Sequence, residues 1–269
     1  MAGSNFVRKV PIGCSLARKN QYRLLPLGTP RPRFRFAARP LTNPLTRPPA
    51  WLRPLFPGSE WRGAPLGPTG RPRLYLTFDD GPIPDETPWV LEQLAAHQAQ
   101  ATFFCVGDNL ARYPDVARAA LAAGHRLGNH TQHHQSAWVT PRAQYLAGVA
   151  ETSLAIRAQL LAVSSPPGDK RLQLTASEQL FRPPYGRLTW PVLRALRQQH
   201  YRIIMWTLLT RDYDASLAPE RALRLTLAAT CPGDIMVLHD SRKASRSLRY
   251  LLPRLLEHYA ALDYEFAAL

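Results

Sequence analysis

Two histidines and a pair of neighbouring aspartates have the residue types that hold a catalytic metal. His130 and His134 form a His-x-x-x-His spacing, and Asp79 and Asp80 are adjacent earlier in the chain. One turn of helix would place both imidazoles on the same side, and one carboxylate would complete three protein ligands while leaving positions open for water or substrate. An open zinc site of this kind lowers the pKa of bound water to about 7 and polarises a carbonyl group. The spacing therefore indicates metal-assisted hydrolysis.

Both clusters also have other interpretations. Adjacent residues on a strand extension point in different directions, so Asp79 and Asp80 should have different tasks instead of forming one clamp. The string Asp-Asp-Gly-Pro would also suit a simple turn after a strand. His133 shares a helix face with His130 at the spacing i, i+3, so it could replace His134 as the ligand.

The elements that must position these residues are short strands and helices in alternation, which favours a mainly parallel sheet. We expect seven strands, at Leu74–Phe78, Ala101–Val106, His125–Asn129, Leu180–Arg182, Tyr201–Thr207, Asp234–His239 and Tyr264–Leu269. Helices are expected at Glu86–His97, Pro114–Ala123, Pro141–Ala162, Thr189–Gln199, Pro219–Thr230 and Ser245–Leu262, with a long loop at Ser164–Gln179. Such a series predicts a small or incomplete barrel, whose active-site groups lie where the strands end. Five of the expected strand ends lead into reactive side chains: Asp79, His130, Arg182, Asp212 and His239.

Composition excludes several classes of protein. The chain has 269 residues, of which 45% are hydrophobic and 9% aromatic, so it is neither disordered throughout nor collagen-like. Three cysteines without a C-x-x-C motif do not suit a disulfide framework or a cysteine-rich zinc site. No run of about 18 apolar residues is present, so we expect no transmembrane segment.

Most of the positive charge lies in the first part of the chain. Of the formal net charge of +15, residues 1–73 contribute fourteen Lys and Arg against one acid, Glu60, and they hold half of the 26 prolines. We expect residues 1–48 to be a disordered Arg/Pro-rich leader, residues 49–71 to be a lead-in that packs on the barrel, and residues 72–267 to be the catalytic domain. The leader is interpreted as a solvated segment or as sequence upstream of a later start, with an arm for nucleic acid or another anionic surface as the alternative.

The beginning of the chain does not predict secretion. Charged residues interrupt the apolar stretch that a signal peptide needs, namely Arg8, Lys9, Arg18 and Lys19. A location in the cytoplasm is therefore the default expectation. We expect a monomer with no nucleic acid partner.

Four motifs resemble the polysaccharide deacetylase family, also known as the NodB-homology domain or carbohydrate esterase family 4. They are T-F-D-D-G-P at 77–82, H-T-Q-H-H at 130–134, R-P-P-Y-G at 182–186 and L-H-D at 238–240. The resemblance covers residues 72–267 and says nothing of residues 1–48. It implies an α/β fold with a distorted, incomplete (β/α)7 barrel. The implied activity is metal-dependent removal of N-acetyl, sometimes O-acetyl, groups from peptidoglycan- or chitin-like sugar polymers.

The resemblance also assigns roles around the metal. Asp80, His130 and His134 would hold one divalent metal, expected to be zinc, with cobalt or nickel as alternatives. Asp79 would be the general base, and Arg182 would pair with it and hold its orientation. Asn129 and Thr131 match neighbours that are typical of the family, and we interpret them as residues that orient the ligands.

The remaining roles concern the leaving group and the acetyl group. His239 would be the general acid, its protonation aided by Asp212, because an amine anion is too poor a leaving group to depart unprotonated. The backbone N–H of Tyr185 would help bind the developing oxyanion. The resemblance implies that the substrate pocket is shaped by Pro184, Tyr185, Trp206, Tyr213 and Leu238, with Trp138 as a further residue of the cleft. Ordinary core packing is the alternative for the aromatic residues among them.

Two positions depart from the family pattern. Thr207 follows Trp206 where the family commonly has an aspartate, and the common Asp-Trp pair is Asp212-Tyr213 here. The first departure predicts an altered polar network under His239, and the second keeps an aromatic wall.

The leading interpretation is an N-deacetylase of an acetylated polysaccharide or oligosaccharide. The alternatives are an O-acetyl esterase that uses the same site and a catalytically silent carbohydrate-binding relative. A third alternative is an anionic-polymer binding protein that acts through the tail, for which affinity would fall steeply with salt.

Overall fold

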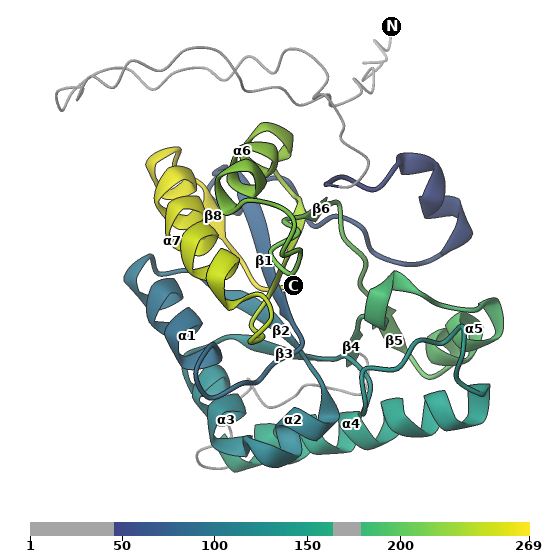
Figure 1. Ribbon diagram of the computed structural model, residues 1–269. Coiled ribbons are helices and arrows are strands. Elements are labelled where there is room, and N and C mark those ends of the chain that lie inside the picture. The colour runs from purple at the N-terminus through teal and green to yellow at the C-terminus, as the bar shows by residue number, and fades with distance from the viewer. Residues whose placement is uncertain (1–45, 164–178) are drawn as a thin grey trace, which may run out of the picture.

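A parallel sheet lies at the centre of the fold, with helices packed around it (Figure 1). The computed structural model describes residues 46–163 and 179–269, so nearly all of the expected leader and of the expected loop at 164–179 lie outside the described residues. The strands are β1 Arg73–Asp79, β2 Ala101–Cys105, β3 Arg126–Asn129, β4 Gln179–Phe181, β5 Tyr201–Ile203, β6 Leu208–Leu209, β7 Ile235–His239 and β8 Glu265–Phe266.

The order of the strands shows an incomplete barrel. The paired path is β5-β4-β3-β2-β1-β7-β6, with β8 beside β1, and all of these pairs are parallel. The path ends at β5 and β6, which are consecutive in the chain but lie at its opposite ends. The segment between them crosses the place where a full barrel would close. For this reason the single strand expected at 201–207 is wrong, and two short strands replace it. The distorted, incomplete barrel itself is confirmed.

Helices cover the sheet, and several of them begin as the sequence indicates. They are α1 Thr87–Ala96, α2 Gly107–Arg112, α3 Pro114–Ala122, α4 Arg142–Val163, α5 Trp190–Gln198, α6 Pro219–Ala229 and α7 Ser245–Ala261, with 3₁₀ helices η1 Ala50–Leu55 and η4 Pro184–Gly186. Proline occupies the first turn of α1, α3, α5 and α6, where its missing N–H removes no helical hydrogen bond. The short helix α2 was not expected.

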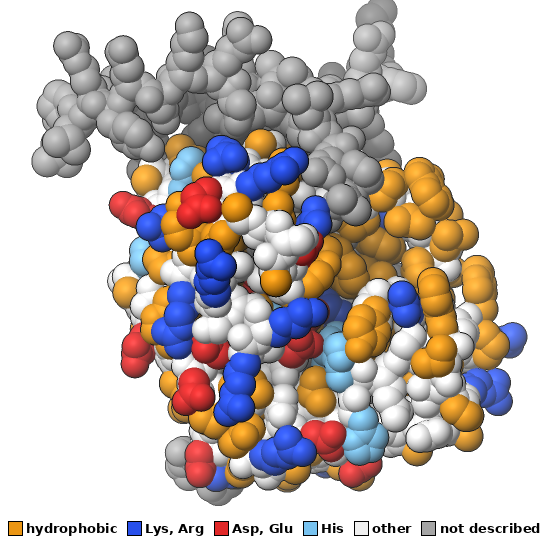
Figure 2. All heavy atoms as spheres, in the orientation of Figure 1, with side chains coloured by type: hydrophobic (Ala, Val, Ile, Leu, Met, Phe, Trp, Pro, Cys, Tyr) orange, Lys and Arg blue, Asp and Glu red, His pale blue; other side chains and the backbone are white. Residues whose placement is uncertain are grey.

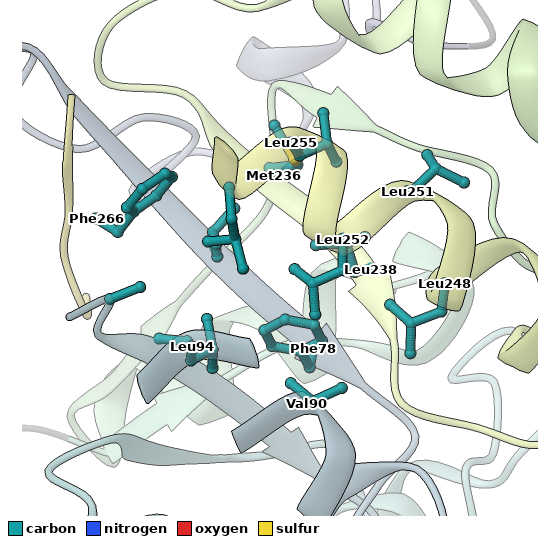
Figure 3. Packing of buried hydrophobic residues seen from close by; sticks show 14 of the residues in the cluster. Phe78, Val90, Leu94, Met236, Leu238, Leu248, Leu251, Leu252, Leu255 and Phe266 are labelled. Carbon is teal, nitrogen blue, oxygen red and sulfur yellow. The ribbon is translucent and has the colours of Figure 1, made fainter. Parts of the chain in front are cut away.

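Alternation along the central strands separates the core from the site. Phe78 of β1 and Leu238 of β7 belong to a fully buried cluster with side chains of α1 and α7, such as Val90 and Leu252 (Figure 3). Successive strand residues point to opposite faces of a sheet. The neighbours on the other face therefore point into the barrel, and they include Asp79 and His239.

The segment before β1 packs against the barrel. Trp61 is buried beside Phe56, with ring centroids 6.0 Å apart, and both carboxylate oxygens of Glu60 accept hydrogen bonds from Arg202. The boundaries of 49–71 as a lead-in and of 72–267 as the domain stay predictions.

Thr46 and Arg47, which the sequence analysis assigned to the leader, contact the barrel. Thr46 is buried and its carbonyl accepts a hydrogen bond from the amide of Leu209. Arg47 forms an ion pair with Asp234, a fully buried carboxylate that also accepts a hydrogen bond from Thr207. A buried carboxylate is stable only when it is paired and hydrogen-bonded, and this requirement brings Arg47 onto the barrel.

Helix α4 is long and apolar enough, by length and composition, to cross a membrane, with a mean hydropathy of 1.3 over 18 residues. The expectation that the chain has no transmembrane segment therefore stays a prediction. Core helices pass the same test, so one helix of this kind is weak evidence for a membrane span. In this structure α4 packs against α2, α3, α5 and β3, and buries Tyr145, Val149 and Thr152.

Candidate active site

Asp80, His130 and His134 converge where β1 and β3 end. Their ligand atoms all lie within 4.8 Å of one another. Asp80 Oδ1 is 3.2 Å from His134 Nε2 and 3.8 Å from His130 Nε2. The structure thus brings together the three residues that the sequence proposes as metal ligands.

The two histidines reach one point through a loop, so the expected helical turn is wrong. Thr131 and His134 both have positive φ angles, of 66° and 51°. Asn129 Oδ1 accepts a hydrogen bond from the amide of Thr131, whose hydroxyl in turn accepts one from the amide of Gln135. Asn129 also donates to the Val149 carbonyl. These contacts hold the left-handed turn, and they fit the expectation that Asn129 and Thr131 orient the ligands.

His130 has the protonation state that a metal ligand needs. Its Nδ1 is 2.8 Å from the carbonyl oxygen of Arg182, a contact in which Nδ1–H donates and Nε2 keeps a free lone pair toward Asp80. Burial lowers the pKa of His130 to about 4, against the opposing charges of Asp79 and Asp80. A neutral imidazole, a second imidazole and a carboxylate form a donor set that fits a divalent metal ion.

His133 is not part of this cluster. Its side chain is 53% exposed, and its Nδ1 lies 2.9 Å from Asp108 Oδ2. The alternative in which His133 replaces His134 as a ligand is therefore excluded by the geometry of the loop.

Asp79 forms a fully buried ion pair with Arg182. Arg182 Nη1 lies 2.7 Å from Asp79 Oδ1 and donates also to the hydroxyl of Thr77, while the guanidinium stacks 4.1 Å from the centre of the Phe104 ring. Burial raises the pKa of Asp79, but the charge and hydrogen bond of Arg182 together with the charges of His130 and His239 hold this pKa below its usual value. Asp79 is therefore an ionised carboxylate at the edge of the pocket.

His239 is the partner of Asp79 across the sheet. The β1–β7 register pairs the two residues directly. Asp212 holds His239 with both carboxylate oxygens, one 2.8 Å from Nδ1 and the other accepting the backbone amide at 2.7 Å. Burial lowers the pKa of His239, but the charge and hydrogen bond of Asp212 raise it to about 9. His239 is thus a cationic acid at neutral pH.

Thr207 does not belong to the network under His239. Its hydroxyl donates to Asp234 and accepts from the amide of Ile235. Asp212 supplies the hydrogen bonds to the ring and the backbone amide of His239, and the altered network stays a prediction.

Asp240 is a buried residue of the site that the sequence analysis missed. Its carboxylate accepts hydrogen bonds from the amide of Gly81 and the hydroxyl of Thr87, and this hydroxyl accepts one from Ile83. A Cβ atom at position 81 would lie 2.1 Å from the Asp240 carboxylate, so only glycine permits this approach. Burial raises the pKa of Asp240 to about 8. The L-H-D motif contained Asp240, but only its long-range contacts reveal that it fixes the loop after Asp80.

The acid, the base and the metal ligands share one pocket of about 560 Å³. Its other walls are Pro183, Tyr185, Trp206, Leu209, Tyr213, Val237 and Lys243. Trp206, Tyr213 and Tyr185 therefore lie where the sequence places them. The Tyr213 ring stands edge-on to His239, with centroids 5.0 Å apart.

Leu238 and Pro184, both predicted as pocket residues, lie elsewhere, and Trp138, predicted for the cleft, is not among the residues that line the pocket. Leu238 is fully buried in the core between the sheet and α7, since strand alternation turns Val237 to the pocket and Leu238 away from it. Pro184 is buried within η4, and its neighbour Pro183 lines the pocket instead. The sequence identified the correct segments but not the faces.

These features define a barrel hydrolase whose pocket contains a candidate three-ligand metal site, an ionised carboxylate and a protonated histidine. The family profile described as polysaccharide deacetylase matches residues 66–204. The chain belongs to the polysaccharide deacetylase family, whose members depend on a metal, and the resemblance in the motifs is confirmed.

Similar proteins include deacetylases of two kinds. The chain is 34% identical to a chitooligosaccharide deacetylase of Sinorhizobium fredii over 66% of its own length and 77% of that protein. It is 27% identical to a peptidoglycan-N-acetylglucosamine deacetylase of Bacillus cereus, over 65% of its own length and 58% of that protein. The crystal structure of the Bc1960 peptidoglycan N-acetylglucosamine deacetylase shares the fold, with a TM-score of 0.64, 22% identity, and coverage of 82% of this chain and 94% of that one.

Proposed function

We propose that this chain is a zinc-dependent hydrolase that removes acetyl groups from N-acetylated sugar polymers of the chitin or peptidoglycan type. The observation that carries the proposal is the pairing of Asp79 with His239 in the same pocket as the Asp80, His130 and His134 cluster. Membership in the polysaccharide deacetylase family and the named deacetylase relatives support the substrate class.

The metal, held by Asp80, His130 and His134, would act as a Lewis acid that polarises the acetyl carbonyl and acidifies the attacking water. Asp79 accepts the proton of this water as its oxygen bonds to the carbonyl carbon. The ion pair with Arg182 keeps Asp79 ionised and fixes the direction of its free oxygen. The backbone N–H of Tyr185 stabilises the negative charge on the carbonyl oxygen.

Departure of the amine needs a proton, and His239 supplies it. The C–N bond breaks as His239 protonates the nitrogen, which leaves a free amino sugar and acetate. Asp212 stabilises the imidazolium before this step. A general acid that is protonated at neutral pH matters more for an amide than for an ester, because an alkoxide leaves more readily than an amide anion.

The experiment that tests the function is acetate release from chitooligosaccharides, peptidoglycan and acetylated xylan, before and after removal of metal and readdition of zinc. We expect release from the first two substrates, loss of activity on chelation, and recovery with zinc. Activity that persists in the metal-free protein, or release from acetylated xylan alone, would contradict the proposal.

A matched pair of variants tests the metal site itself. His134→Ala should lose bound zinc and activity, whereas His133→Ala should keep both. Of these two histidines, His134 lies beside Asp80 and His133 lies beside Asp108. Metal content of the purified proteins gives the result directly. Equal zinc in both variants would contradict the ligand assignment.

A further inference from the structure

A row of exposed side chains leads out of the catalytic pocket. The ring of Tyr185, a wall of the pocket, lies 4.7 Å from that of His134 by their centroids. The guanidinium of Arg187 lies 5.6 Å from the Tyr185 ring and 5.0 Å from the Trp138 ring. We call Tyr185, Arg187 and Trp138 the aromatic row. On the face shown in Figure 2, histidine side chains accordingly border a group of hydrophobic side chains with cations among them.

The row is exposed although its support is rigid. Trp138 and Tyr185 are each 62% exposed. The indole N–H of Trp138 donates to the Leu188 carbonyl at 3.3 Å, and its backbone amide donates to the hydroxyl of Ser136. Beneath the row, the side chains of Ala137 and Leu188 are buried in one cluster. The Trp138 ring is thus held at the surface by its hydrogen bonds, beside the exposed Tyr185 ring, and exposed aromatic groups of this kind are typical of a binding surface.

The cation in the row has no acidic partner among residues 46–163 and 179–269. Arg187 contacts aromatic rings, and no carboxylate in these ranges lies within ion-pair distance of it. Its N–H groups therefore remain able to donate to a ligand that lies on the rings. A planar apolar surface next to several hydrogen-bond donors matches a pyranose ring, which has apolar C–H faces and a polar edge of hydroxyl groups.

We infer that the aromatic row is a subsite for the pyranose ring adjacent to the one whose acetyl group is hydrolysed. The inference rests on the proposed function and adds the direction in which the polymer leaves the pocket. Tyr185 belongs both to the pocket and to the row, so a chain with one residue at His239 continues over Tyr185 toward Trp138. The neighbouring sugar can be neutral, as in chitin, or can carry a carboxylate, as in peptidoglycan.

Chain length is the variable that tests the subsite. Trp138→Ala should raise KM for a pentamer of N-acetylglucosamine by roughly three- to tenfold, the effect of losing one exposed aromatic contact. Its kcat on the pentamer, and its kcat/KM on an aryl acetate that fills only the pocket, should stay close to the wild-type values. Trp138→Phe keeps an aromatic face and should recover most of the lost affinity.

Trp51→Ala is the matched control. Trp51 is 69% exposed, lies on η1 and belongs neither to the pocket lining nor to the aromatic row. It should leave KM for the pentamer unchanged. An unchanged KM in Trp138→Ala, as expected if the row served a protein partner, would overturn the subsite. Equal losses on the pentamer and the aryl acetate would also overturn it, because they would show a general structural effect.

Binding without turnover separates this inference from the proposed function. The Kd of the pentamer, measured by calorimetry in an Asp79→Asn background, should weaken by the same factor when Trp138→Ala is added. If the wild type binds the pentamer through Trp138 but releases no acetate, the function fails and the subsite stands. If it deacetylates the pentamer but the Kd does not depend on Trp138, the subsite fails alone.

The variant Arg187→Gln distinguishes whether the sugar on the aromatic row carries a carboxylate or is neutral. A rise in KM confined to peptidoglycan fragments would identify a carboxylate-bearing ring on the row, and an equal rise on the neutral pentamer would identify hydrogen bonding to hydroxyl groups. No change on either substrate would contradict the role of Arg187 in the subsite.

Discussion

Replacing Asp212 by Asn should remove the proton from the general acid near neutral pH. Asp212 raises the pKa of His239 to about 9 against the effect of burial. An imidazole with a pKa of about 9 is roughly 97% protonated at pH 7.5, whereas one with the ordinary value of about 6.5 is roughly 9% protonated. Without the charge and hydrogen bond of Asp212, the pKa of His239 should fall toward its ordinary value, because burial lowers it and only the charges of Asp79 and Asp80 still raise it. The variant should therefore lose about tenfold in kcat/KM at pH 7.5 on an N-acetylated sugar.

The pH dependence of kcat/KM is the assay for this effect. His239 must be protonated to act, so activity falls as pH rises through its pKa, and Asp212→Asn should move this falling limb downward by about two units or more. A bound divalent cation lowers the pKa of His239 in both proteins, so the difference between them is the quantity to compare. The loss should be much smaller on an aryl acetate, whose leaving group needs no proton. Falling limbs that coincide in the two proteins would refute the role of Asp212.

Three further predictions concern the groups that hold the site. Arg182→Met should destabilise the fold by about 3–5 kcal/mol in urea unfolding, because Asp79 is left buried and unpaired, and adding Asp79→Asn should recover part of this loss. Arg47→Ala should cost about 1–3 kcal/mol in the same measurement, whereas Arg71→Ala, which breaks an exposed pair with Asp263, should cost less than about 1 kcal/mol. Asp240→Ala should weaken zinc binding in a competition titration by about 10- to 100-fold, and Asp240→Asn by less, because the amide keeps the shape and part of the hydrogen bonding.

The positions of the reactive residues could be predicted from sequence because each follows a short apolar run. In a parallel sheet all such runs end at the same edge, so Asp79, His130, Arg182 and His239 must lie close together once the strands are recognised. The structure confirms this reasoning, because Asp79, His130 and His239 line one pocket and the buried Arg182 contacts Asp79 behind it.

What the sequence did not predict depends on contacts between distant residues. Nothing local shows that Arg47 neutralises Asp234, since the partners are far apart in the chain. The loop at His134 adopts a left-handed turn that tertiary hydrogen bonds maintain, so helical spacing was misleading there. The position of Leu238, in contrast, could have been predicted from the sequence, because strict alternation from His239 places it in the core.

The direct pairing of Asp79 with His239 fixes the distance between the backbones that carry the general base and the general acid. Neighbouring strands lie about 4.8 Å apart, and this spacing is maintained by a ladder of hydrogen bonds in the most buried part of the sheet. Closure of a loop on the substrate cannot change the distance between the two backbones that carry base and acid. Tyr185 and Trp138 lie outside this ladder, on segments free of its constraint. Substitutions at Tyr185 and Trp138 can therefore change the polymer that is recognised, while the distance between the backbones of the base and the acid stays constant.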